Sequence, residues 1–267
     1  MCNFDYVEVT FVRKCLNKFG ISLTYSYLCN VNWEIIHIDE TDSTNNWLEL
    51  HKRNRPFCVK TAVWTDYQTT GRGCGTNSWE SERGKNLLFS LMIHPQEIAV
   101  TRQFHISMAI SLALCEAVGQ HIGDLSIKWP NDIYWRNGKI AGILIENRIQ
   151  GHVIKDCIIG VGLNVNQRQF QSPAPNPVSM WQICEHETAR EPLLHAILQA
   201  FDKYMEQDIR QQYLSKLYRR KGFHPYADKD GAFMAELRDV EDDGHLLLCD
   251  EAGRERRYAF KEVSFIN

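Results

Sequence analysis

The chain has 267 residues, of which 44% are hydrophobic and 24% are charged, a composition typical of a globular protein with a sizeable core. Its formal net charge of −3 at pH 7 gives no basic excess that would indicate nucleic-acid binding. No apolar run is long enough to span a membrane, and the N-terminus lacks the charged-then-apolar order of a signal peptide, so we expect a cytoplasmic protein.

The first part of the chain is expected to alternate strands with one helix. Residues 1–32 show no clear periodicity, and no function is assigned to them. The elements expected next are a strand at 33–38, a turn and helix at 39–53 with Ser43 or Thr44 as N-cap, a strand at 58–64, a polar glycine-spaced stretch at 68–86 and a strand at 86–93.

The second part is expected to add helices, a hairpin and a separate β module. The predicted elements are an amphipathic helix at 102–119, a hairpin that turns at Asn137-Gly138, a strand at 152–166, a proline-rich loop at 171–181 and a helix at 191–219. From residue 220 onward, short strands alternate with turn residues, which predicts a small all-β domain appended to a mixed α/β core. The predicted division is therefore 1–32, 33–219 and 220–267.

The polar stretch contains Gly71-Arg72-Gly73. Glycines let the backbone approach a ligand closely, and the planar guanidinium group suits a carboxylate or a phosphate. A flexible solvated loop with a chance arginine explains these residues equally well, because an isolated glycine motif is weak evidence. The stretch matches neither a P-loop nor the dinucleotide-binding fingerprint.

The segment KWPND, residues 128–132, ends one strand because its proline has no N–H for the ladder. If the hairpin closes at Asn137-Gly138, Lys139 returns towards Asp132. A lysine that begins an apolar strand is costly unless it reaches water, a ligand or a partner charge. Taken alone, an edge lysine that reaches water is the better explanation.

Gly160 and Gly162 alternate along the strand predicted at 152–166. Their spacing removes the side chains from one face and indicates that another group packs against bare backbone. A bulge or a bend in a barrel strand is the alternative.

Four segments, taken in order, resemble the catalytic core of biotin protein ligase, also called biotin–[acetyl-CoA-carboxylase] ligase. They are TDSTNNWL (41–48), YQTTGRGCGTNSW (67–79), IKWPNDIYWRNGKIAGILIE (127–146) and IGVGLNVN (159–166). The C-terminal YAFKEVSFI resembles the end of the family's small β-barrel, so the resemblance covers residues 33–267. It implies an α+β fold: a mixed β-sheet catalytic core with packed helices, of the class II synthetase-like type, plus an SH3-like β-barrel.

The resemblance implies an ATP-dependent ligase that works in two steps. The carboxylate of biotin attacks the α-phosphate of ATP and gives biotinyl-5′-AMP and pyrophosphate. A lysine of a biotin carboxyl carrier protein then attacks the mixed anhydride and releases AMP. Mg²⁺ is expected with ATP and is held mostly by phosphates and water, so no metal-ligand residues are predicted.

The resemblance also implies which residues act. Lys139, Arg72 and Asp132 are the expected catalytic residues; Lys139 bridges the biotin carboxylate and the α-phosphate, and Asp132 orients or deprotonates the acceptor amine. The biotin-binding residues are Ser43, Thr44, Asn45, Gln68, Gly71, Arg72, Gly73, Lys139 and Gly142. The adenylate-binding residues are Trp79, Asn131, Asp132 and Asn164.

The chain departs from the family pattern in the glycine-rich loop. Cys74 stands where many members carry a second arginine, and Thr76 and Asn77 stand where basic residues are common. The loop therefore carries less positive charge, which bears on how tightly it retains the adenylate.

Members that double as repressors carry an N-terminal helix-turn-helix domain, whereas the 32 residues before the core show no two-helix pattern, so no specific DNA binding is predicted. Pairing of two copies through an exposed sheet edge is left open.

The rival functions are a lipoate or octanoate transferase, which shares the core fold, and a non-catalytic biotin-binding or regulatory module. An unrelated α/β protein with chance motifs is the third alternative.

Overall fold

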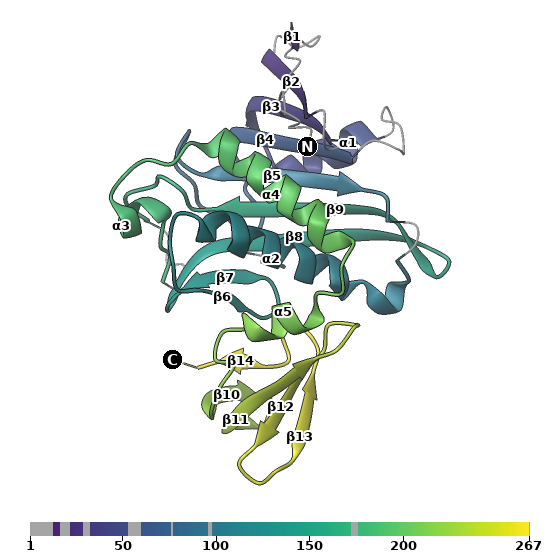
Figure 1. The fold of residues 1–267 in the computed structure, drawn as a ribbon, viewed down its shortest axis with the longest axis vertical. Helices are drawn as coiled ribbons and strands as arrows, with labels where there is room; N and C mark the ends of the chain where they lie inside the picture. The colour runs from purple at the N-terminus through teal and green to yellow at the C-terminus, as the bar shows by residue number, and fades with distance from the viewer. Residues whose placement is uncertain are drawn as a thin grey trace, which may run out of the picture.

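The computed structural model describes residues 13–16, 22–28, 33–52, 60–75, 77–95, 98–171 and 176–266. Within these residues the chain forms a nine-stranded mixed sheet with packed helices and a separate five-stranded antiparallel sheet near the C-terminus (Figure 1). The predicted α+β fold class is confirmed.

In the large sheet, every neighbouring pair is antiparallel except β3 and β4, which are joined by helix α1 (Thr44–His51). The order is β1-β2-β3-β4-β5-β9-β8-β7-β6. The strands are β1 (Arg13–Leu16), β2 (Ser22–Leu28), β3 (Trp33–Thr41), β4 (Lys60–Gln68), β5 (Leu87–Ile93), β6 (Leu125–Lys128), β7 (Asp132–Trp135), β8 (Gly138–Gln150) and β9 (Val153–Leu163). Two strands thus lie within residues 1–32, where no element was expected, and β2 pairs with β3 in the main sheet.

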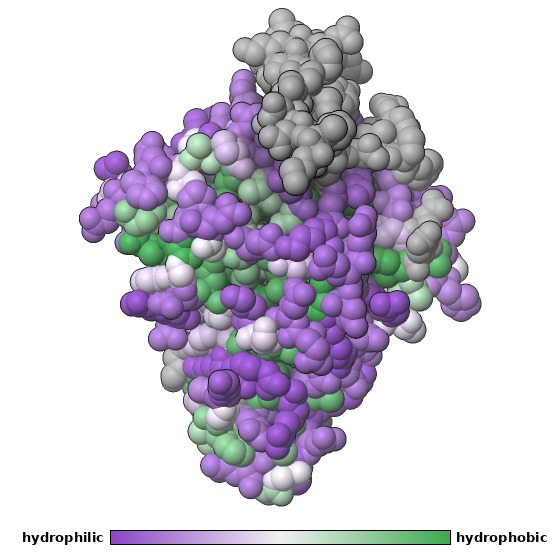
Figure 2. All heavy atoms as spheres, in the orientation of Figure 1, coloured by the Kyte–Doolittle hydropathy of each residue, from purple (hydrophilic) through white to green (hydrophobic). Residues whose placement is uncertain are grey.

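Helices α2 (Phe104–Gly119) and α4 (Arg190–Met205) pack on one face of this sheet, in front of it in Figure 1. Leu48 of α1 packs with Ile36, Val63 and Ile158 in a second, smaller cluster of buried residues. All seven residues of β5 are buried because the strand is covered on both faces. Hydrophilic residues cover most of the face that α2 and α4 present (Figure 2). No helix in the described residues is long and apolar enough to cross a membrane.

The second sheet has the order β13-β12-β11-β10-β14, formed by β10 (His224–Asp228), β11 (Gly231–Val240), β12 (Leu246–Asp250), β13 (Glu255–Tyr258) and β14 (Ser264–Phe265). It is tied to the large sheet at the KWPND segment, where the indole nitrogen of buried Trp129 donates a 3.0 Å hydrogen bond to the carbonyl of Gly244. Short helices complete the fold: η2 (Val100–Arg102), α3 (Met180–Cys184) and α5 (Arg210–Ser215).

The single helix predicted at 191–219 is wrong. The chain forms α4 and α5 with a break between them, where the Asp208 carboxylate accepts a 3.4 Å hydrogen bond from the backbone N–H of Arg210. The side chain of Arg210 then pairs with Asp239 and Asp242 of the second sheet. Apolar residues continue at helical spacing across the break, so periodicity alone does not reveal it.

The turn predicted at Asn137-Gly138 is displaced by one residue. Trp135 pairs with Gly138, so the turn consists of Arg136 and Asn137, with Arg136 at a φ of 50°. Gly138 is instead the first residue of β8. A Cβ there would lie 2.7 Å from Val178, so close packing rather than turn geometry requires the glycine.

We expect Trp129→Phe to lower the free energy of unfolding by about 1–3 kcal/mol, because the Gly244 carbonyl would lose its donor. Denaturant unfolding measures the change. Trp135→Phe is the matched control, because it makes the same change from an indole to a phenyl ring. Trp135 is only partly buried against the core. Equal losses in the two variants would show that the hydrogen bond does not secure the second sheet.

Candidate active site

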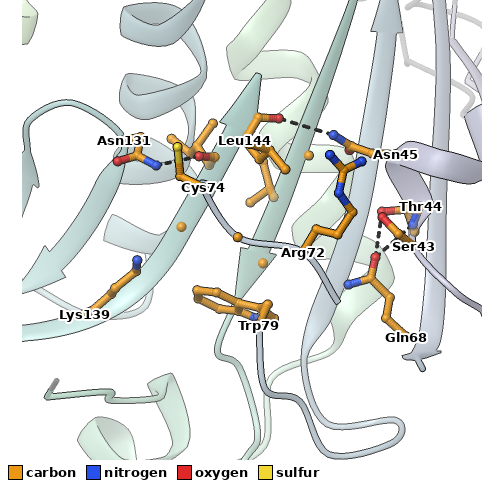
Figure 3. Close-up of a pocket in the computed structure, with 16 residues that line it drawn as sticks. Ser43, Thr44, Asn45, Gln68, Arg72, Cys74, Trp79, Asn131, Lys139 and Leu144 are labelled. Carbon is orange, nitrogen blue, oxygen red and sulfur yellow. Dashed lines mark hydrogen bonds between the residues drawn. The ribbon is translucent and has the colours of Figure 1, made fainter. Parts of the chain in front are cut away.

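A cavity lies over β4, β8 and β9, under the N-terminus of α1 and the glycine-rich loop after β4 (Figure 3). Ten of the thirteen site residues expected from the sequence line it, so residues from separated motifs meet at one cavity. The lining residues are Ser43, Thr44, Asn45, Gln68, Arg72, Gly73, Cys74, Trp79, Asn131, Lys139, Gly142, Ile143, Leu144, Gly160, Val161 and Gly162.

The end of the cavity at α1 is a buried polar cluster. Gln68 accepts hydrogen bonds from the backbone N–H of Thr44 at 2.8 Å and from its hydroxyl at 3.1 Å. Gln68 thereby satisfies one of the free backbone N–H groups at the N-terminus of α1, where the N-cap residue Ser43 provides no side-chain cap. The hydroxyl of Ser90 lies 2.6 Å from the Thr44 hydroxyl and 2.5 Å from the Asn45 side-chain oxygen.

Bare backbone forms the floor of the cavity, as the alternating glycines predicted. Cβ atoms added to Gly142 and Gly162 would meet the Trp79 ring, the first at 2.9 Å and the second in direct collision. A Cβ on Gly160 would collide with the Asn45 side-chain oxygen. The three glycines therefore let Trp79 and Asn45 lie directly on the strands.

Two backbone hydrogen bonds shape the loop that carries Arg72. Trp79 donates to the carbonyl of Gly71 at 2.9 Å, and Gly73 donates to that of Asn77 at 2.7 Å. The ring of Trp79 thereby comes to lie over the floor, and its indole nitrogen is buried without a hydrogen-bond partner among the described residues. Gly71 itself does not line the cavity.

Lys139 and Asp132 meet as the hairpin predicted, with 2.7 Å between the ammonium nitrogen and a carboxylate oxygen. The Lys139 nitrogen also lies 5.5 Å from the centroid of the Trp79 ring. Neighbouring Lys128 has a pKa below its usual value, mainly because burial removes water from the ammonium group and despite the opposing charge of Asp132. The carboxylate thus sits between two lysines next to the cavity.

Arg72 points in another direction, towards α1 and the second half of β8. It donates to Asn46 at 2.9 Å and pairs with Glu146 at 2.8 Å. In Figure 3, Arg72 and Lys139 lie on either side of Trp79. The two cations expected to bind anions are therefore separated across the cavity.

The remaining expected residues have mixed placements. Asn131 lines the cavity and donates to the carbonyl of Ile143 at 2.8 Å. Asn164 is buried at 2% exposure, donates to the carbonyl of Val178, and does not line the cavity. Its nucleotide-binding role stays a prediction.

Ser90, Asn46 and Glu146 belong to the site but were not predicted from the sequence. A lone serine in the apolar run of β5 and a glutamate at the end of the apolar run of β8 are the only sequence signals of two of them. Neither signal predicts which residues the side chain contacts, because those residues lie on α1 and in the glycine-rich loop.

We expect Gly162→Ala to lower the free energy of unfolding by about 1–3 kcal/mol and to displace Trp79, because the added methyl group overlaps its ring. Denaturant unfolding gives the first value, and accessibility of Trp79 to an indole-modifying reagent gives the second. Gly123→Ala is the control, since a Cβ there meets nothing within 4 Å. Unchanged accessibility of Trp79 would contradict its placement on the floor.

The chain is similar in sequence to known proteins. The sequence model of the Biotin/lipoate A/B protein ligase family matches residues 38–164. The biotin–[acetyl-CoA-carboxylase] ligase of Paracoccus denitrificans is 30% identical over 231 residues, 80% of this chain and 94% of that protein. The bifunctional ligase/repressor BirA of Bacillus subtilis is 28% identical over 247 residues, 84% of this chain and 72% of that protein.

Among solved structures, the Aquifex aeolicus biotin protein ligase in complex with biotin and ATP has a similar fold. Its TM-score is 0.71 at 24% identity, with coverage of 86% of this chain and 97% of that chain. A mutant of the same ligase in complex with biotin gives a TM-score of 0.67 at 25% identity, with coverage of 87% and 97%.

Proposed function

The chain belongs to the biotin protein ligases of the Biotin/lipoate A/B protein ligase family, and from this premise we propose that it activates biotin with ATP and transfers it to a lysine of a carrier protein. In the first step a biotin carboxylate oxygen bonds to the α-phosphorus of ATP, and pyrophosphate leaves. In the second, the acceptor amine bonds to the acyl carbon and loses a proton, and AMP leaves with the electron pair of the broken acyl–oxygen bond.

The cavity suits such a ligand from end to end. The polar cluster of Ser43, Thr44, Asn45 and Gln68 offers hydrogen bonds to the ureido ring. The aliphatic tail would lie beside the bare backbone at Gly142, and the Trp79 ring, which lies directly over this glycine, would have to move to admit it. The carboxylate would then lie near Lys139 and within reach of the loop that carries Arg72.

The observation that carries the proposal is the ion pair of Lys139 with Asp132 beside the glycine floor. Two anions react in the first step, and a positioned ammonium group offsets the charge that develops between them. Once substrate takes over Lys139, the carboxylate of Asp132 is free to orient or deprotonate the acceptor amine. Trp79, Asn131 and Asn164 are the proposed adenylate contacts, and the nucleotide enters as its Mg²⁺ complex.

A biotin carboxyl carrier protein is the proposed acceptor. The Paracoccus denitrificans relative is named as a ligase for acetyl-CoA carboxylase. An acceptor of this kind presents one lysine on a small folded domain. The side chain of this lysine would have to enter the cavity from its open side.

Biotin-dependent exchange of labelled pyrophosphate into ATP, without acceptor protein, tests the first step. We expect exchange with biotin and none with lipoate or octanoate. If lipoate or octanoate supports exchange and biotin does not, that acid and not biotin is the substrate. Biotin binding without exchange would favour the non-catalytic module.

Lys139→Ala is expected to reduce the exchange rate at least ~10²-fold, because it removes the cation at the reacting carboxylate and phosphate. Thermal unfolding should show that the variant remains folded. Lys229→Ala removes a lysine from the exposed turn after β10 and is the matched control. Wild-type exchange by the Lys139 variant would refute the assigned role.

Cys74→Arg is expected to slow the release of biotinyl-5′-AMP about fivefold, or ~1 kcal/mol, because it adds a cation to a loop residue that lines the cavity. Dissociation of labelled adenylate measures the rate. Cys74→Gln adds a long neutral side chain and separates charge from size. Equal release by wild type and the arginine variant would show that position 74 does not govern retention.

A further inference from the structure

Glu146 connects two parts of the site through different oxygen atoms. One carboxylate oxygen accepts a 2.7 Å hydrogen bond from the side-chain amide of Asn45 on α1. The other lies 2.8 Å from the guanidinium group of Arg72 in the glycine-rich loop. A single residue in the second half of β8 thus holds both the polar end of the cavity and the loop that covers it.

Both ends of the Arg72 guanidinium group are already engaged. One terminal nitrogen pairs with Glu146 and the other donates to Asn46 at 2.9 Å. In the proposed function, however, Arg72 must turn to the biotin carboxylate or the phosphates. Its guanidinium group points towards α1 and β8, so turning it to a substrate anion breaks the contacts with Glu146 and Asn46.

We propose that Glu146 is a positioning residue that holds Arg72 away from the substrate anions until one of them replaces its carboxylate, while its second oxygen keeps Asn45 in place for the biotin ring. The inference rests on the proposed function and adds the step by which the loop is recruited. Glu146 never contacts the reacting atoms in this scheme; it acts through Arg72 and Asn45.

Exposure makes the exchange of partners feasible. The side chains of Arg72 and Glu146 are 44% and 40% exposed, and ion pairs this exposed are weak. A substrate carboxylate or phosphate offers Arg72 an equally good charge-assisted partner. The resident pair therefore lowers the fraction of molecules whose loop is ready to bind, and it weakens anion affinity several-fold rather than by orders of magnitude.

Glu146→Gln separates the two contacts. The glutamine retains an amide oxygen to accept from Asn45 but carries no charge for Arg72. Glu146→Ala removes both contacts. The first variant should therefore free the loop and spare the polar end, whereas the second should damage both.

Limited trypsin digestion tests the hold on Arg72 without any substrate. We expect cleavage after Arg72, identified by mass, to be several-fold faster in Glu146→Gln than in wild type. Glu40→Gln is the crossed control, because Glu40 pairs with Arg83 further along the same polar stretch. It should accelerate cleavage after Arg83 and leave the Arg72 site unchanged. Equal cleavage after Arg72 in wild type and Glu146→Gln would overturn the proposal.

Binding of biotin and of its uncharged methyl ester, measured by calorimetry, tests the link to the anion. Glu146→Gln should bind biotin about two- to fivefold more tightly than wild type, with no gain for the ester. Glu146→Ala should lose affinity for both, since Asn45 is released. If Glu146→Gln changes the affinities for biotin and for the ester equally, Glu146 has only a structural role, and the inference is overturned. If wild type binds neither ligand while the trypsin result holds, the proposed function fails and the hold on Arg72 stands.

Discussion

The bare backbone of β8 and β9 is the constraint on which the rest of the site depends. Trp79 from the loop and Asn45 from α1 can both lie on these strands only because Gly142, Gly160 and Gly162 carry no side chain. Elements that are far apart in the sequence therefore meet at one surface, and the polar end, the loop and the lysine hairpin take their positions from it. An ordinary alternating strand would fill this space with core side chains and leave no cavity.

Electrostatic balance follows from the same arrangement. Lys139 is paired with Asp132, and Arg72 is paired with Glu146, on opposite sides of the Trp79 ring. Each cation thus has a carboxylate partner within the protein itself, which avoids an uncompensated charge in a partly enclosed site. Because these pairs remain partly exposed, a change of partner costs little.

The local features of the site can be predicted from the sequence better than its long-range contacts can. The meeting of Lys139 with Asp132 follows from hairpin geometry, and the covered floor follows from the spacing of Gly160 and Gly162, so both could be predicted. Glu146 could not, because its two partners come from α1 and the loop, and only the crossing of those elements brings them together.

The misplaced elements have physical causes of the same kind. The break between α4 and α5 depends on Asp208 and on the attachment of Arg210 to the second sheet, while the apolar spacing continues through it. The position of the hairpin turn depends on the contact between Gly138 and Val178, which are distant in sequence. Residues 22–27 in β2 alternate polar and apolar side chains, which is a strand signal, whereas the four residues of β1 are too few to show a pattern.

The capping of α1 by Gln68 has a consequence for molecular discrimination. Both lone pairs of its amide oxygen are directed to Thr44, at 2.8 and 3.1 Å, so only the amide nitrogen remains to meet a ligand. At Gln68 the site therefore distinguishes hydrogen-bond acceptors from donors: an incoming oxygen completes the amide, whereas an incoming N–H leaves two donors facing each other, at a cost of about 1–3 kcal/mol. The contact at the start of the helix thus sets the hydrogen-bonding polarity of the ligand atom that meets Gln68.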